Sequence, residues 1–544
     1  MSESLSEKDT VKVNAGAVKG DIESDSYDGD GVPNRTLHRQ LKNRHVAMIS
    51  MGGVIGTGLF LGTANALMQG GPVGMLLGYT AMGTVVFAMM TSLGEMVSYL
   101  PIPGGHIKLA ERFVNPAFSF AMGWNYWYNW LITAPVELSA SAVLVNYWNH
   151  SVNDGVWIAI FAVVVIAINL LGAGAYGEAE FIFASIKIIT IVGLIILGIV
   201  LDLGGGPDHD RLGFRYWKNP GPFAQYLGIA GAEGRFLGFW AVLVQASFSF
   251  QGTEIVAIAA GEAKNPRRNL PKAVKRVYIR ILFFYILGTL MIGLLVPYNN
   301  PRLNLADGTA AASPFVIAIE IAGIKALPSI INASLLTAAT SAASSDIYTS
   351  SRALFGLAAA GNAPKIFLRV TKNGMPWVSV TFCSLFVVLA YMSLGSGSAG
   401  QVFDWLSTMT SISGLMTWFG ISITYIQFYK GTKAQGLDRT TFPYWTRFQP
   451  FCGYYSAVAC FVIAFFSAFN VFIHDQWNTA TFVTSYLPFI GFFILYGGAY
   501  LYYRVPPVKP ADMDFVTNIA EIEADEVDDP PPKNKMEAFW AWLM

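Results

Sequence analysis

Long apolar stretches alternate with short polar segments between residues 46 and 503. The apolar stretches begin near residues 46, 74, 118, 155, 178, 238, 276, 327, 377, 402, 454 and 482. Each is long enough for a membrane-spanning helix, because crossing the hydrocarbon core of a bilayer takes about 20 helical residues. The pattern therefore predicts an all-α polytopic membrane protein with twelve transmembrane helices.

Composition supports this class and separates the two ends of the chain from its middle. Hydrophobic residues make up 53% of the 544 residues and charged residues only 13%, whereas a soluble domain has roughly 25% charged residues. Residues 1–45 and 504–544 are acidic and rich in Ser, Asp and Pro, which predicts disordered tails. The sequence thus predicts an N-terminal tail (1–45), a twelve-span domain (46–503) and a C-terminal tail (504–544). The N-terminus lacks a cleavable signal pattern, so the first span is expected to direct insertion.

The positions of Lys and Arg predict the orientation of the spans. If the N-terminus is cytoplasmic, 28 of the 35 Lys and Arg residues lie on the cytoplasmic side and six on the other. The remaining one, Lys187, lies within the fifth span. Because positive residues near span ends favour the cytoplasm, both termini are predicted to be cytoplasmic.

Cysteine and histidine give no sign of a metal site or of intramembrane catalysis. Cys383, Cys452 and Cys460 lie in or beside apolar spans without metal-ligand spacing. The six histidines lie in tails, loops or span ends, and the spans contain no nucleophile and base pair. A membrane enzyme is therefore disfavoured, and no cofactor, metal or nucleic-acid partner is expected.

A few ionisable residues interrupt the predicted spans. Placing such a residue at a helix centre costs about 2.5 to 3.5 kcal/mol, so it normally faces a partner or a water-filled path. Lys187, Glu137 and Glu254 are candidates for a solute or proton path, and the alternative is a structural pair that locks helices together. Three further acids, Glu95, Glu262 and Asp346, lie closer to the cytoplasmic ends of their spans. Of these, Glu95 and Glu262 are expected to be structural.

Glycines cluster inside two predicted spans. The first cluster is "GGVIGTGLFLG" (Gly52–Gly62), which contains GxxxG pairs suited to close helix packing. The same residues also favour a break in the helix, where free N–H groups can bind a carboxylate. A second candidate break, around Gly252 in "SFSFQGTEIVAIAAGE" (Ser247–Glu262), lies five spans later. Breaks at matching positions of two repeats are typical of the substrate site of a transporter.

Several longer stretches make a specific resemblance. They are "GGVIGTGLFLGT", "SLGEMVSYLPIPGG", "GWNYWYNWLITAPVELSA", "FASIKIITIVGLII", "GGGPDHDRLGFRYWKNPGPF", "QGTEIVAIAAGEAKNPRRNLPKAV", "ASPFVIAIEIAGI" and "SSDIYTSSRALFGLAAAGNAPK". Over nearly the whole chain, the sequence resembles fungal amino-acid permeases of the yeast amino-acid transporter family, within the amino acid-polyamine-organocation superfamily. The resemblance implies a LeuT-like inverted repeat of five plus five spans, followed by two C-terminal helices.

The resemblance also implies which residues meet the substrate. The substrate carboxylate is expected at the backbone of the first span, and its ammonium at backbone carbonyls of the first and sixth spans. Side-chain selection would fall to Glu137 and to Ser413, Thr417 and Trp418 of the tenth span, for which core packing is the alternative. The residues expected to bind substrate are Val54, Gly56, Thr57, Gly58, Phe248, Gln251, Glu254 and Trp418.

Proton coupling follows from a further resemblance. Lys187 resembles the lysine that reaches between the first and eighth spans in sodium-independent carriers, so Lys187, Glu254 and Glu137 are expected to couple transport to protons. The implied protein is a broad-range amino-acid permease of the plasma membrane that works by alternating access. Its expected partners are an amino acid, a proton and the bilayer, and its tails would bind ubiquitination or trafficking machinery. The alternatives are a narrow-range dicarboxylic amino-acid or proline permease, and a non-transporting sensor.

Overall fold

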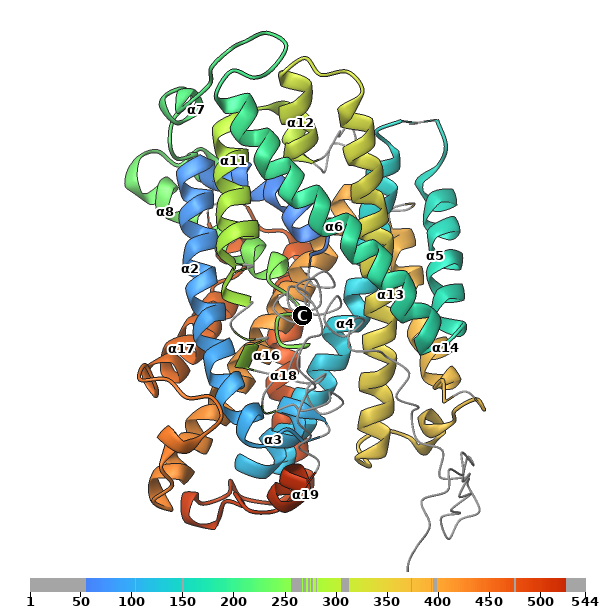
Figure 1. Cartoon of the computed structure of the whole chain (residues 1–544), viewed down its shortest axis with the longest axis vertical. Coiled ribbons are helices and arrows are strands. Elements are labelled where there is room, and N and C mark those ends of the chain that lie inside the picture. The colour runs from blue at the N-terminus through green and yellow to red at the C-terminus, as the bar shows by residue number, and fades with distance from the viewer. Residues whose placement is uncertain are drawn as a thin grey trace, which may run out of the picture.

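The computed structural model describes most of the predicted spans as an upright helical bundle (Figure 1). It covers residues 55–255, 267, 271–272, 274, 277–279, 281–304 and 313–524, apart from 103, 149–150, 373, 393, 395–398 and 474–475. This part of the chain contains helices and no strand. Val54 and Glu262, two residues singled out in the sequence, lie outside the described residues.

Several helix boundaries follow the predicted apolar stretches, and others differ from them. The long helices are α2 (Thr63–Tyr99), α4 (Pro116–Val145), α5 (Asp154–Leu170), α6 (Ala173–Asp202), α8 (Gly231–Ser249), α13 (Leu327–Ala359), α16 (Ala399–Ala434), α17 (Phe451–Phe465) and α18 (Thr479–Tyr503). Helices α6 and α8 begin earlier than predicted, and α2 continues through the predicted start near residue 74. The shorter helices are α3 (Gly105–Phe113), α7 (Arg215–Lys218), α11 (Leu287–Leu295), α12 (Pro314–Ile321), α14 (Trp377–Leu385) and α19 (Ile519–Ala524). Two π-helical segments, Gly58–Gly62 and Ile281–Ile286, precede α2 and α11.

Four described helices are both long and apolar enough to cross a membrane. They are Gly58–Tyr99, Gly174–Asp202, Val277–Leu295 and Thr479–Tyr503. The first contains the boundary between the first two predicted spans, because Gly71 has φ 71° and Pro72 follows it. Helices α4, α13 and α16 have 30, 33 and 36 residues, but each buries many Ser and Thr side chains. Their polar faces point into the bundle. The buried Ser and Thr lower the mean hydropathy of these three helices, although each helix is long and largely buried.

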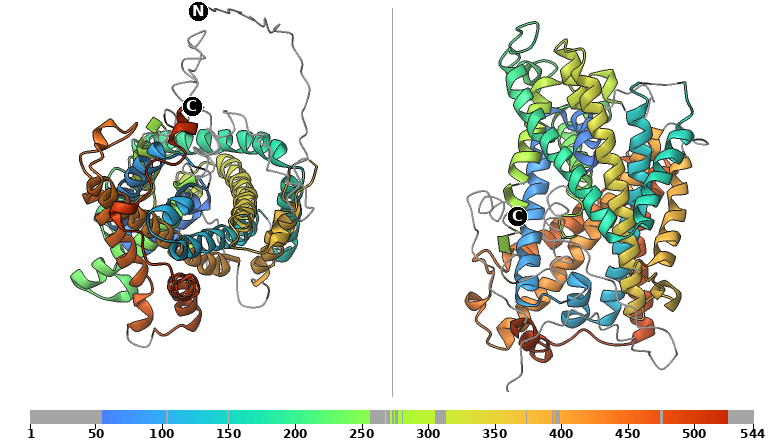
Figure 2. Two further views of the ribbon diagram at one scale, coloured as in Figure 1. Left: turned by 90° about the horizontal axis from the view of Figure 1, so that it is seen from below. Right: turned by 45° about the vertical axis from the view of Figure 1, so that its right-hand side comes forward.

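The long polar-faced helices form the interior, and apolar helices surround them. Helix α4 packs against α13, α16 and α18, and α2 packs against α8. Figure 2 shows α13 and α4 inside the ring of helices when the bundle is seen from below. Side chains on α5 and α6 remain widely exposed, for example Val163 at 68% and Ile189 at 71%. A row of exposed apolar residues on outer helices is what contact with lipid requires.

Residues 505–524 pack against the bundle, so the prediction of a disordered C-terminal tail was wrong for this segment. Phe515 is only 2% exposed, and its carbonyl accepts a hydrogen bond of 3.1 Å from the hydroxyl of Tyr99. The N–H of Val508 donates to the carbonyl of Val114 at 2.8 Å. Figure 1 shows this segment and α19 beside α3 at one end of the bundle. Composition misled the prediction because a single buried aromatic side chain anchors an otherwise polar stretch.

Candidate functional site

The first glycine-rich segment is irregular at residues 55 and 56, the first residues that the structure describes. Ile55 and Gly56 lie outside any helix, and Gly58–Gly62 is π-helical. The N–H of Thr57 donates to Oε1 of Glu137 on α4 at 3.4 Å, and the Thr57 hydroxyl donates to the same oxygen at 3.0 Å. A Cβ on Gly56 would lie 3.0 Å from that oxygen. The segment therefore holds a carboxylate oxygen with a backbone N–H and a hydroxyl, without any cation in direct contact among the described residues.

The second predicted break lies directly against the first. Helix α8 ends at Ser249, and residues 250–254 form a turn in which Gly252 has φ 84°. A Cβ on Gly58 would lie 2.7 Å from Cα of Ser249 and 3.0 Å from the ring of Phe248. The two irregular segments thus touch backbone to backbone.

This contact gives Gly58 a packing role. Real Cβ atoms essentially never approach another backbone atom to 2.7 Å, so any side chain at position 58 would push the two segments apart. The sequence left close packing as the alternative to carboxylate binding, and the geometry supports close packing at this glycine. A bulky substitution here would disturb the fold as well as transport.

Glu254 and Trp418 meet at the second break. The indole N–H of Trp418 donates to Oε2 of Glu254 at 3.0 Å, and both residues are at most 1% exposed. The sequence placed Trp418 in the wall around the substrate side chain. In the structure its polar atom positions the Glu254 carboxylate and so connects α16 to the break after α8.

Ser413 and Thr417 of α16 contribute to helix packing. The side-chain amide of Asn125 donates to the carbonyl of Ser413 and to the hydroxyl of Thr417, both at 2.9 Å. The Ser413 hydroxyl in turn donates to the backbone carbonyl of Asn125 at 3.2 Å. These contacts join α4 to α16 and support the core-packing interpretation of both residues.

A second polar position on α4, which is not among the site residues predicted from the sequence, faces the break after α8. The Asn129 amide lies 3.5 Å from Oε1 of Gln251, and the Thr133 hydroxyl donates to that of Thr410 at 3.3 Å. Among the described residues, Oδ1 of Asn129 and Nε2 of Gln251 have no hydrogen-bond partner. The spacing of Asn125, Asn129 and Thr133 was the available signal, since residues four apart share one helix face.

Lys187 lies in a buried group of charged residues. Its Nζ is 3.6 Å from Oε1 of Glu180, and each residue is 1% exposed. Asp346 of α13 is buried nearby and interacts electrostatically with Lys187, Glu180 and Glu137. Glu180 is not among the residues predicted from the sequence, because it directly precedes the apolar run from Phe181. Its spacing of seven residues from Lys187 places the two side chains on one helix face.

Hydroxyl groups of α13 complete this buried group. Oε2 of Glu180 accepts hydrogen bonds from Ser341 at 2.6 Å and from Ser345 at 3.2 Å. Figure 1 shows α6 crossing α13 obliquely, which brings these side chains together. The described members with formal charge are three carboxylates, Glu137, Glu180 and Asp346, and one ammonium, Lys187. Because a net charge of this size is costly in a low-dielectric interior, the group is suited to take up protons.

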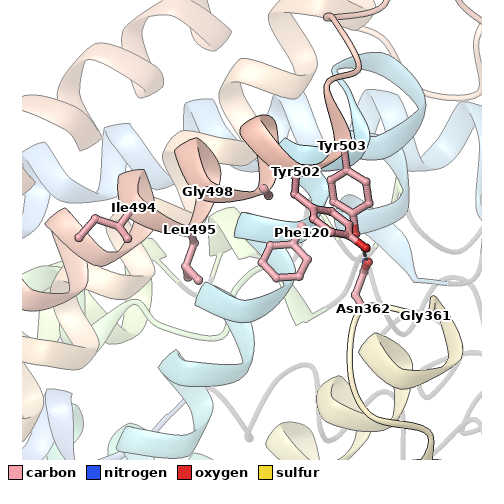
Figure 3. A pocket seen from close by; sticks show the side chains of 9 residues that line it. Phe120, Gly361, Asn362, Ile494, Leu495, Gly498, Tyr502 and Tyr503 are labelled. Carbon is pink, nitrogen blue, oxygen red and sulfur yellow. Dashed lines mark hydrogen bonds between the residues drawn. The ribbon is translucent and has the colours of Figure 1, made fainter.

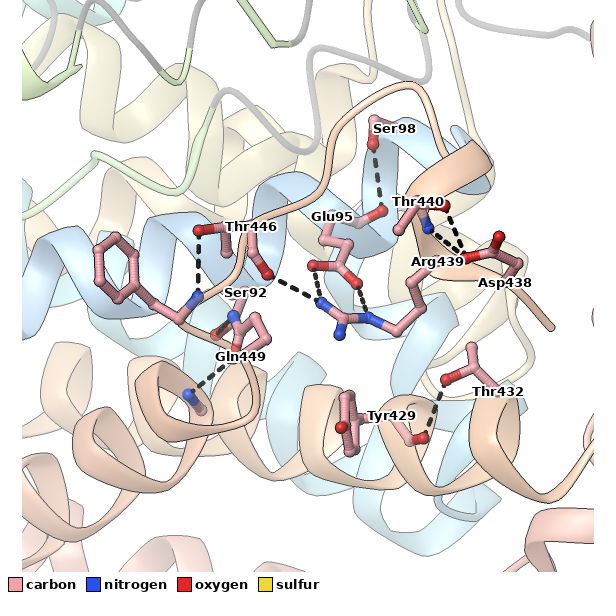
Figure 4. A network of polar contacts seen from close by, with 12 residues as sticks. Ser92, Glu95, Ser98, Tyr429, Thr432, Asp438, Arg439, Thr440, Thr446 and Gln449 are labelled. Carbon is pink, nitrogen blue, oxygen red and sulfur yellow. Dashed lines mark hydrogen bonds and ion pairs between the residues drawn. The ribbon is translucent and has the colours of Figure 1, made fainter. Parts of the chain in front are cut away.

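Glu95 has the structural role that the sequence predicted. Arg439, in the segment after α16, donates to its two oxygens at 2.5 and 2.8 Å. The guanidinium also donates to the carbonyl of Thr446 at 3.3 Å and lies over the ring of Tyr429. Figure 4 shows how this pair fastens the α16–α17 connection to α2.

A surface pocket of about 410 Å³ lies away from all of these residues. Phe120, the residues 361–362 and one face of α18 form its lining, and the hydroxyl of Tyr503 donates to Asn362 at 2.9 Å. Figure 3 shows its aromatic and aliphatic lining. Its lining contains no charged side chain and none of the predicted site residues.

Comparison with known proteins identifies the family that carries this site. A family model described as "Amino acid permease" matches residues 45–509. The chain belongs to the amino acid permease family. It is 43% identical to the dicarboxylic amino acid permease of Saccharomyces cerevisiae over 490 residues, which cover 89% of this chain and 80% of that protein. It is 40% identical to the proline-specific permease of Emericella nidulans over 527 residues, 95% of each chain. It is also 40% identical to the lysine-specific permease of S. cerevisiae over 510 residues, 93% of this chain and 83% of that one.

The family fixes the general activity of the chain. These relatives are transporters and not enzymes, and this permease is a multi-pass helical membrane protein that takes up amino acids. The relatives are named for acidic, imino and basic substrates at similar identity, so the family leaves the preferred amino acid open.

Proposed function

We propose that this permease is a proton-coupled importer that binds the substrate carboxylate at the first helix break. The observation that carries the proposal is the contact between Glu137 and Thr57. Oε1 of Glu137 lies 3.4 Å from the backbone nitrogen of Thr57 and 3.0 Å from the Thr57 hydroxyl oxygen. A substrate carboxylate bound at Gly56, Thr57 and Gly58 would need the same two donors.

Competition for these donors supplies the coupling. Two ionised carboxylates about 4 Å apart repel each other by about 4 kcal/mol at an effective dielectric constant of about 20. This repulsion corresponds to a loss of about a thousandfold in affinity. Protonation of Glu137 removes the repulsion and releases Thr57 for the substrate. The substrate and the proton would therefore bind together and be released together.

Lys187 and Glu254 extend the coupling to the two halves of the bundle. Lys187 lies within electrostatic reach of Glu137 and of Asp346 on α13, and while its amine is protonated the ammonium would replace a sodium ion as the positive charge. Glu254, held by Trp418, lies at the second break, where it would respond to closure of α16 over the substrate. We expect transport that depends on protons and is independent of sodium.

The membrane arrangement that fits this mechanism has twelve spans. The helices of the described residues and the distribution of Lys and Arg support five plus five inverted spans, two further helices and cytoplasmic termini. Plasma-membrane uptake with tails that bind trafficking or ubiquitination machinery is consistent with this arrangement. A sensor on the same scaffold would bind amino acids without accumulating them.

The polar wall around the second break favours a broad range of substrates. The Asn129 amide faces Gln251, and Thr133 faces Thr410. These side chains are uncharged and can both donate and accept hydrogen bonds, so they accommodate many neutral side chains. The alternatives are a narrow-range dicarboxylic amino-acid permease and a proline permease. Competition of unlabelled amino acids against one labelled substrate distinguishes these two from a broad-range permease.

Uptake by cells that express Glu137→Gln tests the mechanism. The neutral amide mimics a permanently protonated Glu137, so substrate exchange should continue while proton-driven accumulation is lost. Ser141→Ala is the matched control, because the Ser141 hydroxyl donates to the backbone carbonyl of Glu137 and not to its carboxylate. Normal accumulation by Glu137→Gln, or uptake that needs sodium and ignores a protonophore, would refute proton coupling through this residue.

A further inference from the structure

Glu180 occupies a position that the mechanism above does not use. It lies on the second turn of α6, between buried Lys187 and the end of α6 at which the helix begins. The positive-residue count assigns that end of α6 to the cytoplasm. Any proton that leaves Lys187 for the cytoplasm along α6 therefore passes Glu180.

A continuous line of polar groups extends from Glu180 toward that end of the helix. Ser345 donates to Oε2 of Glu180 at 3.2 Å, and the hydroxyl of Tyr176 donates to Ser345 at 3.0 Å. The ring of Tyr176 is stacked on that of Tyr348 with their centroids 4.0 Å apart. The guanidinium of Arg352, one turn further along α13, lies 3.5 Å from the centre of the Tyr348 ring.

We propose that Glu180 accepts the proton of Lys187 and releases it at the cytoplasmic end of α6, through Ser345 and Tyr176. In this step an N–H bond of the Lys187 ammonium breaks and an O–H bond forms on Oε1 of Glu180. The pair changes from ammonium and carboxylate to amine and carboxylic acid. The carboxylic acid then turns so that its O–H faces the Ser345 hydroxyl. The Ser345 and Tyr176 hydroxyls, which donate toward the carboxylate in the structure, reverse their direction and pass the proton to cytoplasmic water, and Glu180 returns to the carboxylate.

The geometry suits a transfer that is controlled by conformation. The separation of 3.6 Å exceeds the distance of about 2.9 Å in a direct N–H···O hydrogen bond. Transfer thus requires a small approach of the two side chains, or one water molecule between them. The stacked rings of Tyr176 and Tyr348 cover the path, and Tyr176 is 2% exposed. Opening of the cytoplasmic side would let water reach Glu180 only at one stage of the cycle.

Charged groups of both signs lie around Glu180. Lys187 on α6 is the cation beside Glu180, and Arg352 on α13 interacts with the neighbouring Tyr176. Asp346 of α13 and Glu137 of α4 are the other acids of the group. Lys187 interacts electrostatically with both Glu180 and Glu137, so two acids of this buried group compete for its proton. Glu137 contacts the first break through Thr57, and Glu180 lies nearer the start of α6.

The inference rests on the proposed proton coupling, and the variant Glu180→Gln tests it separately. We expect the accumulation ratio of labelled amino acid to fall by about tenfold or more, since an amide cannot accept the proton. Exchange of internal for external amino acid, which needs no net proton release, should persist at similar surface levels. Glu178→Gln is the matched control, because Glu178 has the same side chain on the same helix but is exposed.

A purely structural ion pair predicts different results. A lock would lose surface delivery and exchange together in Glu180→Gln, whereas Glu180→Asp should restore part of the accumulation if the carboxylate itself is required. Normal accumulation by Glu180→Gln overturns the proposal. If Glu180→Gln does not reach the surface, Ser345→Ala decides, because it leaves both charges in place. Unchanged proton-driven accumulation by Ser345→Ala then overturns the proposed exit.

The variant Lys187→Ala distinguishes the two proposals from each other. If Lys187→Ala still accumulates substrate in a protonophore-sensitive manner, coupling through Lys187 fails and the exit through Glu180 fails with it. If Lys187→Ala is uncoupled but Glu180→Gln is normal, only the exit path is wrong.

Discussion

Two buried acids, Glu95 and Glu180, show opposite ways of accommodating a charge in this bundle. Glu95 receives two short hydrogen bonds from Arg439 at 2.5 and 2.8 Å, so both of its oxygens are neutralised by one cation. Glu180 receives hydroxyl donors and a lysine at 3.6 Å, and it shares that lysine with Glu137 and Asp346. The first charge is fully compensated, whereas the second lies in a group that has more acids than cations among the residues that the structure describes.

On the proposed mechanism, this difference separates the buried charges that move protons from those that hold helices together. A compensated pair is stable in one protonation state, and removing one partner leaves an isolated charge that destabilises the fold. An uncompensated group has several protonation states of similar free energy, which is the property a coupling site needs. Burial and the presence of a carboxylate are common to both regions, so the balance of partners makes the distinction.

The largest expected effect is on Lys187. Replacing it by Ala should reduce proton-driven accumulation by about a hundredfold, in the range typical of lost proton-transfer groups. Exchange and surface delivery should survive, because the remaining acids can be neutralised by protons. Labelled uptake with and without a protonophore, together with surface labelling, measures both. Loss of surface delivery without selective uncoupling would place Lys187 in the same class as Arg439.

Glu95→Ala should act on stability. It leaves the Arg439 guanidinium without its carboxylate, and breaking a buried pair in this way costs about 3–5 kcal/mol. Thermal unfolding in detergent should show the loss, and substrate affinity in the folded fraction should not change. The double variant Glu95→Gln/Arg439→Gln should recover part of the stability. A stable Glu95→Ala protein with uncoupled transport would contradict the comparison.

Phe515→Ala should detach the C-terminal segment. The ring packs against Phe113 and Phe428 with centroids 5.2 and 5.4 Å apart, and truncating a buried Phe costs about 3–5 kcal/mol. Because the segment is at the chain end, the cost should appear as faster proteolysis of residues 505–524 and faster hydrogen exchange there, with the rest of the bundle intact. Val516→Ala, a change at an exposed neighbour, is the control and should leave proteolysis unchanged.

The smallest effect concerns Asp514, whose side chain accepts from the N–H groups of Val516 and Thr517 at 3.0 and 2.9 Å. Burial alone would raise the pKa of this carboxyl, but these hydrogen bonds and Arg112 lower the pKa to about 2. This pKa is below the usual value of 3.8 for Asp. The ionised Asp514 therefore stabilises the attached segment fully above pH 3.8, and this stabilisation is lost as the pH falls toward 2. The segment should therefore stay attached between pH 5 and 8. Hydrogen exchange at Thr517, corrected for the intrinsic rates, should not change over this range. Detachment near pH 6 would show that another group controls the segment.

Features that depend on local sequence could be predicted with good accuracy. Helices α4, α5, α13 and α14 begin within two residues of the predicted starts, because a run of about 20 apolar residues is itself the physical requirement for a span. The break around Gly252 was also predictable, since glycine tolerates a positive φ at no steric cost. The tail was mispredicted because average composition carries no information about one buried residue such as Phe515.

The sequence by itself determined the helical membrane class, the family and the identity of the residues that do not belong in an apolar span. Only the tertiary structure decided which of these residues meet. Thr57 and Glu137 are 80 positions apart, Trp418 and Glu254 are 164 apart, and Ser341 and Glu180 are 161 apart. Whether a buried charge is compensated depends on such long-range contacts, because electrostatic energy follows distance in space and not separation along the chain.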